Sequence, residues 1–326
     1  MRRVFVLCVF AACHSTGEAS APSRGEVVEA AVEAGVEVEA STEAGTGTAT
    51  VTGSGSGLDG GADAGGPEGM LLVPGGTFTM GADSGGEEDE HPAHAVTLKA
   101  FWLDRTEVTN EAYLACVKAG ACTINARTIA SATHAGPDVN FTGPKKPVVG
   151  VRWDDAKAFC GWKGLRLPME AEFERAVRDD DGRRYPWGNE KPTPDRTVFS
   201  RAYGRDSTDD VGSHPTGRGP YGHDDLAGNV WEWMEDEYDP YAYRRATAAQ
   251  GVPGTCAQIL ATLSELRAAG KQGFTGSNGI PIDCEHVLRG GAYNYDWNGL
   301  RSTNRVHHPG RFRLVMTGFR CAKDAE

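Results

Sequence analysis

The sequence has no hydrophobic run long enough to cross a membrane and no excess of positive charge. A membrane-spanning helix needs about 20 consecutive apolar residues, and no run in the chain approaches that length. The 33 lysines and arginines are outnumbered by 45 aspartates and glutamates, so the formal net charge is -12 at pH 7. Because nucleic-acid phosphates are bound by clustered lysines and arginines, this balance argues against a nucleic-acid partner.

Aromatic residues are absent from residues 14–68, which consist mainly of Ala, Gly, Ser, Thr, Val and Glu. Such a segment cannot bury enough apolar surface to offset the entropy lost on ordering, so we predict a flexible linker. Aromatic and branched residues become frequent from Met70 onward. The folded domain is therefore predicted to occupy residues 69–324.

The N-terminus has the pattern of a secretory signal. Arg2 and Arg3 precede a short apolar run that ends at Cys13. The small residues before this cysteine resemble a bacterial lipobox, so we predict a lipoprotein signal peptide over residues 1–13 with Cys13 as the acylated residue. A plain signal peptide cut nearby is the alternative. The first interpretation places the domain in the bacterial cell envelope, attached to a membrane by its N-terminal lipid, at the outer membrane, in the periplasm or outside the cell.

Local patterns predict several elements of the domain. A strand from Met70, a turn at residues 74–76 and a second strand with Phe78 and Met80 come first. Thr109 has the position of an N-cap for a helix that stops at Gly120. A buried strand is expected at residues 147–151.

Two further helices are predicted, one of which carries closely spaced glutamates. Asp154 is expected to cap a helix over residues 155–163, and Pro168 suits the first turn of the next helix. Glu170 and Glu172 lie two positions apart in that next helix and therefore face different ways, which favours capping and salt-bridge roles over paired acid–base chemistry.

An insertion is predicted at about residues 243–285. It carries an amphipathic helical pattern over residues 255–269, with Cys256 near its start and Cys284 after it. The apolar face of this helix packs on the domain or binds a partner.

Several motifs occur in the order found in one known family. They are PGGTFTMG at 74–81, GLRLPMEAEFE at 164–174, YPWGN at 185–189, GNVWEW at 228–233, RGG at 289–291 and GFRC at 318–321. Over about residues 70–323 the chain resembles the sulfatase-modifying-factor family, which includes the formylglycine-generating enzymes. The resemblance implies a complex α+β fold, related to the C-type-lectin-like fold, with little regular secondary structure and with disulfides and calcium holding it together.

The oxidases of that family hold copper through two cysteines that follow the RGG motif, and there they oxidise a substrate cysteine. The matching positions here are Tyr295 and Leu300. Copper(I) selects thiolate ligands, so copper is not expected in this chain. We predict a surface-tethered domain of this family that is a non-catalytic binding or accessory module. The alternative is a formylglycine-generating-type oxidoreductase that acts on a protein or peptide through another metal.

The residues around the RGG motif are candidates for a binding pocket, because aromatic rings alternate there with polar groups. A peptide, protein or glycan at the cell surface is the predicted ligand, and a plain structural loop is the alternative. The candidates are Arg289, Tyr293, Asn294, Tyr295, Asp296 and Trp297.

The resemblance also implies a calcium site. The matching ligands are the side chain of Asp225, the backbone carbonyls of Gly228 and Val230, and the carboxylate of Glu232. These are hard oxygen donors of the kind that calcium prefers. The alternative for Glu232 is an ion pair with a nearby arginine.

Six cysteines follow residue 68. The resemblance implies a disulfide between Cys160 and Cys321. Cys116 and Cys122 flank the stop of a predicted helix, and Cys256 and Cys284 bound the helix of the insertion, so two local disulfides complete the proposal. Six cysteines allow 15 pairings, and this is the one that we expect.

Overall fold

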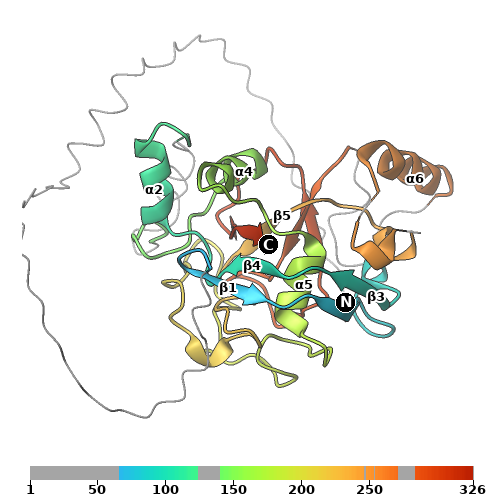
Figure 1. Cartoon of the computed structure of the whole chain (residues 1–326), viewed down its shortest axis with the longest axis horizontal. Helices are drawn as coiled ribbons and strands as arrows, with labels where there is room; N and C mark the ends of the chain where they lie inside the picture. The colour runs from blue at the N-terminus through green and yellow to red at the C-terminus, as the bar shows by residue number, and fades with distance from the viewer. Residues whose placement is uncertain (1–65, 124–139, 246, 253, 271–282, 326) are drawn as a thin grey trace, which may run out of the picture. The chain divides into compact units, whose positions relative to one another are not determined.

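The computed structural model describes residues 66–123, 140–245, 247–252, 254–270 and 283–325 (Figure 1). Cys13, the predicted signal peptide and residues 14–65 of the predicted linker lie outside these ranges. The strands are β1 (Met70–Val73), β2 (Gly76–Met80), β3 (His94–Leu98), β4 (Phe101–Asp104), β5 (Trp231–Glu237), β6 (His286–Arg289), β7 (Val306–His308), β8 (Thr317–Gly318) and β9 (Ala322–Asp324). The helices are α2 (Asn110–Lys118), α4 (Trp153–Trp162), α5 (Glu170–Arg178) and α6 (Cys256–Ala268), with short 3₁₀ turns at Glu88–Glu90, Pro215–Gly217, Ala242–Arg244 and Ala248–Gln250. The fold thus mixes helices and strands, with few helices, as the motifs predict.

The strands form three small sheets. One has the order β1-β4-β9, the second pairs β2 with β3, and the third has the order β7-β6-β5-β8. All neighbours are antiparallel except β5 and β8, which run parallel. Figure 1 shows β1 beside β4. The strands predicted on either side of the turn at residues 74–76 are present, and each belongs to a different sheet.

The first sheet joins the beginning of the domain to its end. Leu103 of β4 stands opposite Leu71 of β1 on one side and Ala322 of β9 on the other. Leu103 and Ala322 are fully buried and share an apolar cluster with Phe173 and Val177 of α5. Burial of this shared face is what holds α5 on the sheet.

Strand β5 is buried along most of its length. Trp231 and Trp233 project to one side, as predicted, and pack in the largest apolar cluster together with residues of α2 and α4. Glu232 projects to the other side and is also buried. A charged side chain can stay in such a place only with close partners, which are described below.

The predicted helix caps are partly confirmed. The Thr109 hydroxyl accepts a hydrogen bond from the Ala112 N–H at 3.2 Å, so α2 begins where expected. Helix α6 begins after Thr255 and ends at Ala268, close to the predicted range. Helix α4 begins earlier than predicted, because Asp155 accepts the N–H of Arg152, which is the actual N-cap. Asp154 therefore lies inside the helix.

Two other predictions of local structure are wrong. Residues 147–151 do not form a strand, although Val148, Val149 and Val151 are buried. Their N–H groups bond to separate segments, Val148 to Val108 and Gly150 to Leu314 and Thr317, so no ladder forms. Pro168 precedes α5 instead of opening it, since Met169 is the N-cap.

The three expected disulfides are present: Cys116–Cys122, Cys160–Cys321 and Cys256–Cys284. Cys160–Cys321 joins α4 to the residue before β9, across 161 positions of sequence. No helix in the described part of the chain is both long and apolar enough to cross a bilayer.

Candidate functional site

The RGG segment, residues 289–300, follows β6 and folds back on itself. Gly290 and Gly291 have φ angles of 95° and 84°, which favour glycine. A Cβ atom at Gly291 would lie 2.8 Å from the carbonyl oxygen of Gly299, so the segment closes only with a glycine here. This tight return brings Tyr295 and Leu300 back beside the core.

The two positions that match the family's copper-binding cysteines lie in an apolar cluster. Leu300 is 1% exposed and packs with Tyr185 and Ala227. Tyr295 is half-buried, and its ring meets that of Trp231 edge-on with centroids 5.1 Å apart. All six cysteines among the described residues are in disulfides. Within residues 66–325 as described, no free thiol is available to a soft metal ion.

The predicted pocket residues divide into interior and surface groups. Arg289 is 1% exposed, and Tyr293 is buried against Phe141. Asn294, Tyr295 and Trp297 are partly exposed, and Asp296 is exposed. Only the last four can therefore meet a ligand from solution without movement of the segment.

Arg289 belongs to a buried network of ions beneath the RGG segment. It donates to Glu170 at 3.1 Å and to Glu174, and also to the backbone carbonyl of Ser302 at 2.7 Å. Arg305 holds both oxygens of Glu170, at 2.7 and 2.9 Å. Burial alone would raise the pKa of Glu174, but Arg289 and Arg178 hold it below its ordinary value. These buried, ion-paired side chains form a charged floor beneath the RGG segment.

Glutamates of α5 thus serve as ion-pair and capping groups, as predicted. Glu172 accepts the N–H of Met169 at 2.8 Å and closes the N-terminus of the helix. It also binds Arg166 through both oxygens, at 2.6 and 2.7 Å.

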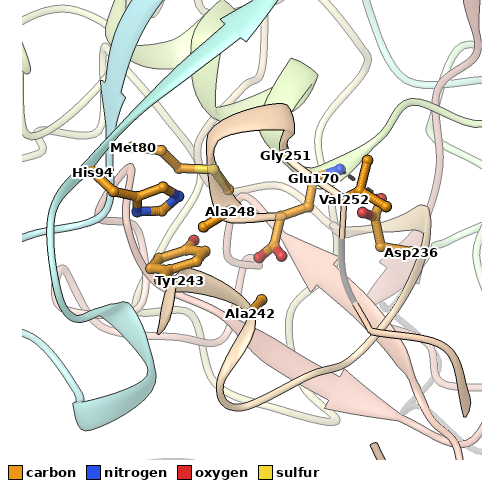
Figure 2. A pocket seen from close by; sticks show the side chains of 9 residues that line it. All are labelled: Met80, His94, Glu170, Asp236, Ala242, Tyr243, Ala248, Gly251 and Val252. Carbon is orange, nitrogen blue, oxygen red and sulfur yellow. Dashed lines mark hydrogen bonds between the residues drawn. The ribbon is translucent and has the colours of Figure 1, made fainter. Parts of the chain in front are cut away.

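A small cavity lies beside this network (Figure 2). Its volume is about 10 Å³, which is room for about one water molecule. The rings of His94 and Tyr243 lie together on its wall, with centroids 4.6 Å apart. Asp236 accepts the N–H of Glu170 at 2.7 Å; burial and then the Glu170 carboxylate raise the pKa of Asp236 to about 8. The cavity is too small for an organic ligand, and the raised pKa of Asp236 keeps that carboxyl mostly protonated at neutral pH.

A basic pocket lies beside the RGG segment, at the residues that directly follow it. It has a volume of about 200 Å³. Its lining consists of Ala82, Ser84, Gly85, Gly86, Arg178, Arg184, Arg301, Ser302 and Thr303. Sequence reasoning missed this pocket, because Arg301 is far from Arg178 and Arg184 in the chain. The only available signal was that Arg184 and Arg301 are neighbours of Tyr185 and Leu300.

A larger groove of about 540 Å³ runs between α4, α5 and the end of the chain. All but one of its charged side chains pair with one another: Lys157 with Glu235 at 2.5 Å, and Arg166 with Glu172 and Asp324. Lys99 forms no ion pair with a described residue. The groove therefore offers a ligand little unpaired charge.

The residues expected to bind calcium are close to arginine. Both oxygens of Glu232 accept hydrogen bonds from Arg320, at 2.7 and 2.8 Å, and both side chains are buried. The alternative expected for Glu232, an ion pair with arginine, is present. Asp225 has a φ of 57° and accepts the N–H of Gly212 at 2.6 Å.

Glu107 is a further member of this acidic site that the sequence did not single out. Burial, and next the Asp225 carboxylate, raise the pKa of Glu107 well above its ordinary value. Burial also raises the pKa of Asp225. Among the described residues neither Glu107 nor Asp225 forms an ion pair with a lysine or arginine. The one close group of three metal-binding side chains in the described ranges is Glu237, Cys256 and Cys284, whose cysteines form a disulfide.

The sequence and the fold of this chain are similar to those of several known proteins. A family model described as the sulfatase-modifying factor enzyme 1-like domain matches residues 61–325. A formylglycine-generating enzyme from Streptomyces coelicolor is 32% identical over 79% of this chain and 90% of its own length. The inactive C-alpha-formylglycine-generating enzyme 2 from Bos taurus is 33% identical over 52% of this chain and 71% of its own. PvdO from Pseudomonas aeruginosa has a similar fold, with 23% identity and a TM-score of 0.57 over 78% of this chain and 94% of that one.

Proposed function

Because the chain belongs to the sulfatase-modifying factor enzyme 1-like family, we propose that it is a binding or accessory member that does not oxidise cysteine through copper. The observation that carries this proposal is the pair of side chains at the family's cysteine positions. Tyr295 is a hard, weakly acidic donor, and Leu300 donates nothing. Both pack in an apolar cluster, so the place of the thiolates is filled.

Family membership does not decide the activity, because fold and function vary independently. The relatives include one named as a formylglycine-generating enzyme and one named as inactive. For this chain to supply two thiolates near the RGG segment, a disulfide would have to open and its cysteines would have to move. The side chains present do not fit a copper(I) ion.

We propose a peptide, protein or glycan at the cell surface as the ligand, with the membrane reached through a lipid on Cys13. Support for the ligand comes from the partly exposed Asn294, Tyr295 and Trp297 and the exposed Asp296, which present aromatic and polar groups together. The buried charged floor under them keeps the segment in one conformation, which reduces the entropy lost on binding.

We also propose calcium at the acidic site. Asp225 and Glu107 are buried and form no ion pair with a lysine or arginine among the described residues, so a hard cation there would offset two carboxylates. Asp225, the carbonyls of Gly228 and Val230, and a Glu232 shared with Arg320 would hold it. When bound, calcium would cross-link the segments before β5.

Calcium is expected to raise the thermal unfolding midpoint of the full chain, and a chelator is expected to lower it by several degrees. Asp225→Gly should abolish the calcium effect, because it removes a ligand at a φ that glycine adopts without strain. Differential scanning calorimetry of both proteins, with calcium and with chelator, measures the midpoints. Equal midpoints with calcium and with chelator would contradict the site.

The proposed function is tested on the full chain purified from an oxidising compartment. Copper(I) is added, unbound metal is removed by gel filtration, and the retained copper and iron are measured. A cysteine-containing peptide is then incubated with the protein and examined by mass spectrometry, with the Streptomyces relative as the positive control. We expect neither retained copper nor peptide oxidation. Stoichiometric redox metal together with peptide oxidation would establish the alternative, an oxidoreductase that uses another site.

A further inference from the structure

We propose that the basic pocket beside the RGG segment binds the anionic group of an acidic saccharide, a sugar that carries a carboxylate or sulfate. The proposal rests on the proposed function, since it names the ligand class of a binding module. The pocket is lined by three arginines, by small residues of one loop and by two hydroxyl residues: Arg178, Arg184, Arg301, Ala82, Ser84, Gly85, Gly86, Ser302 and Thr303.

Buried carboxylates hold two of the arginines in place. Arg301 holds both oxygens of Glu90, at 2.5 and 2.8 Å, and Glu90 is fully buried. Arg178 donates to Glu174 at 2.8 Å and to the carbonyl of Gly81 at 2.6 Å. Their side chains are only 10% and 9% exposed. The guanidinium groups are therefore preorganised, and little side-chain entropy would be lost on binding.

The pocket retains unused hydrogen-bond donors. A guanidinium has five N–H donors. Arg178 uses three of them, two on Nη1 and one on Nη2, which leaves one N–H on Nη2; its Nε has no partner within the described part of the chain but is buried from solvent. Arg184 is exposed, and its guanidinium donates no hydrogen bond to any described residue. An oxyanion accepts several such bonds at once, in the planar geometry that arginine offers.

The charge of the lining favours an anion. It includes three arginines and no carboxylate; Arg178 and Arg301 are paired with Glu174 and Glu90, so Arg184 carries the positive charge that no described carboxylate offsets. Gly86, with a φ of 73°, passes close to the Glu90–Arg301 pair: a Cβ there would lie 2.3 Å from Oε2 of Glu90 and 2.7 Å from Nη1 of Arg301. The net charge of the whole chain is -12, so binding of an anion would require this local site and could not come from overall attraction.

Aromatic rings beside the pocket indicate a saccharide. The Arg184 guanidinium lies 5.3 Å from the ring centroid of Trp297 and 5.8 Å from that of Tyr185. Tyr185 stacks in turn on the partly exposed Trp187, with centroids 5.2 Å apart. The negative face of an aromatic ring attracts the C–H groups on the face of a sugar. A ring next to an arginine therefore suits a sugar that bears an acidic substituent.

The pocket adjoins the apolar cluster at the family's cysteine positions. Arg184 directly precedes Tyr185, and Arg301 directly follows Leu300, both members of that cluster. A saccharide held by the arginines would extend across Tyr295 and Trp297. One ligand would thus contact the basic pocket and the exposed part of the RGG segment.

Calorimetric titration of the full chain tests the proposal. The probes are a heparin-derived hexasaccharide, neutral maltohexaose, inorganic sulfate and an acidic peptide. We expect the acidic hexasaccharide to bind at least tenfold more tightly than the other three, and more weakly as salt is raised. Arg184→Ala should weaken its binding about tenfold, the effect of one lost charge-assisted hydrogen bond, and Trp297→Ala should also weaken it.

Arg311→Ala is the matched control, since Arg311 is 66% exposed and lies outside the pocket. Equal losses for Arg184→Ala and Arg311→Ala would overturn the proposal, and so would tighter binding of the acidic peptide or no binding of the hexasaccharide. None of these results would affect the copper measurement, so failure of the saccharide proposal and failure of the proposed function are distinguishable.

Discussion

Among single residues, Arg320 and Glu232 form an ion pair in which both side chains are 0% exposed. Arg320 also donates to the backbone carbonyls of Asp104, Arg105 and Asp224. Arg320→Met should lower the free energy of unfolding by about 3–5 kcal/mol, because it leaves a buried carboxylate without its partner. Urea denaturation measures the loss. Arg311→Met, at an exposed position, should change stability by less than about 0.5 kcal/mol; a similarly small loss for Arg320→Met would contradict the prediction.

Asp236 should make stability depend on pH. Burial and Glu170 raise its pKa in the folded state to about 8, against an ordinary value of 3.8. Between these values the unfolded chain has released a proton that the folded chain keeps, so stability falls as pH rises from about 4 to about 8. The Asp236→Asn variant has no carboxyl group to titrate at this position. As the pH rises through this range, the free energy of unfolding of the variant should therefore increase, relative to that of the original chain, by up to about 1.4 kcal/mol per pH unit. Urea midpoints at pH 5 and pH 8 measure this, and parallel curves would refute it.

Predictions about single residues were confirmed where the partner lies nearby in the chain or where a family motif contains the residue. The disulfides and the capping role of Glu172 are examples. They failed to place Arg289, which was expected at a pocket and lies 1% exposed among Glu170 and Glu174. Those glutamates are more than 110 positions away in the chain. No local pattern reveals such a pairing.

Among elements, α5 illustrates how tertiary contacts override composition. It consists of EAEFERAVR, yet all nine residues are buried. Its cap and its helical type could be predicted from local sequence. Its burial could not, because Glu170 and Glu174 are paired with Arg289 of β6 and Glu170 also with Arg305 just before β7, both far away in the chain. Residues 147–151 show the converse. Their apolar sequence predicts a strand, but no described strand forms a hydrogen-bonded ladder with them.

The disulfides tie elements together over very different spans. Removing Cys160–Cys321 by paired Cys→Ala changes should lower stability by about 5 kcal/mol, while removing Cys116–Cys122 should cost only about 2 kcal/mol. The difference arises because the first closes a loop of 161 residues and the second a loop of 6. Urea denaturation of the two double variants compares them. The opposite order would show that native-state strain outweighs loop entropy.

For the whole molecule, the family and the mixed fold could be predicted from the sequence, because its motifs lie at positions that constrain the structure. Gly290 and Gly291 have positive φ angles, and the tryptophans of β5 lie in the core.

The predicted linker remains a prediction. A chain that begins at Gly60 should unfold at the same urea concentration as the full chain, since residues 14–59 have a composition that cannot form a core. A lower midpoint for the shorter chain would show that the N-terminal residues contribute to folding.

The first sheet has a consequence for how the protein is made. Its middle strand, β4, pairs with β1 on one side and with β9, which ends at Asp324, on the other. Because β9 leaves the ribosome long after β4, one edge of β4 stays open until then, and the Cys160–Cys321 bond cannot form earlier. A chain that lacks β9 would leave that edge exposed to strands of other chains. Completion of the first sheet therefore depends on β9.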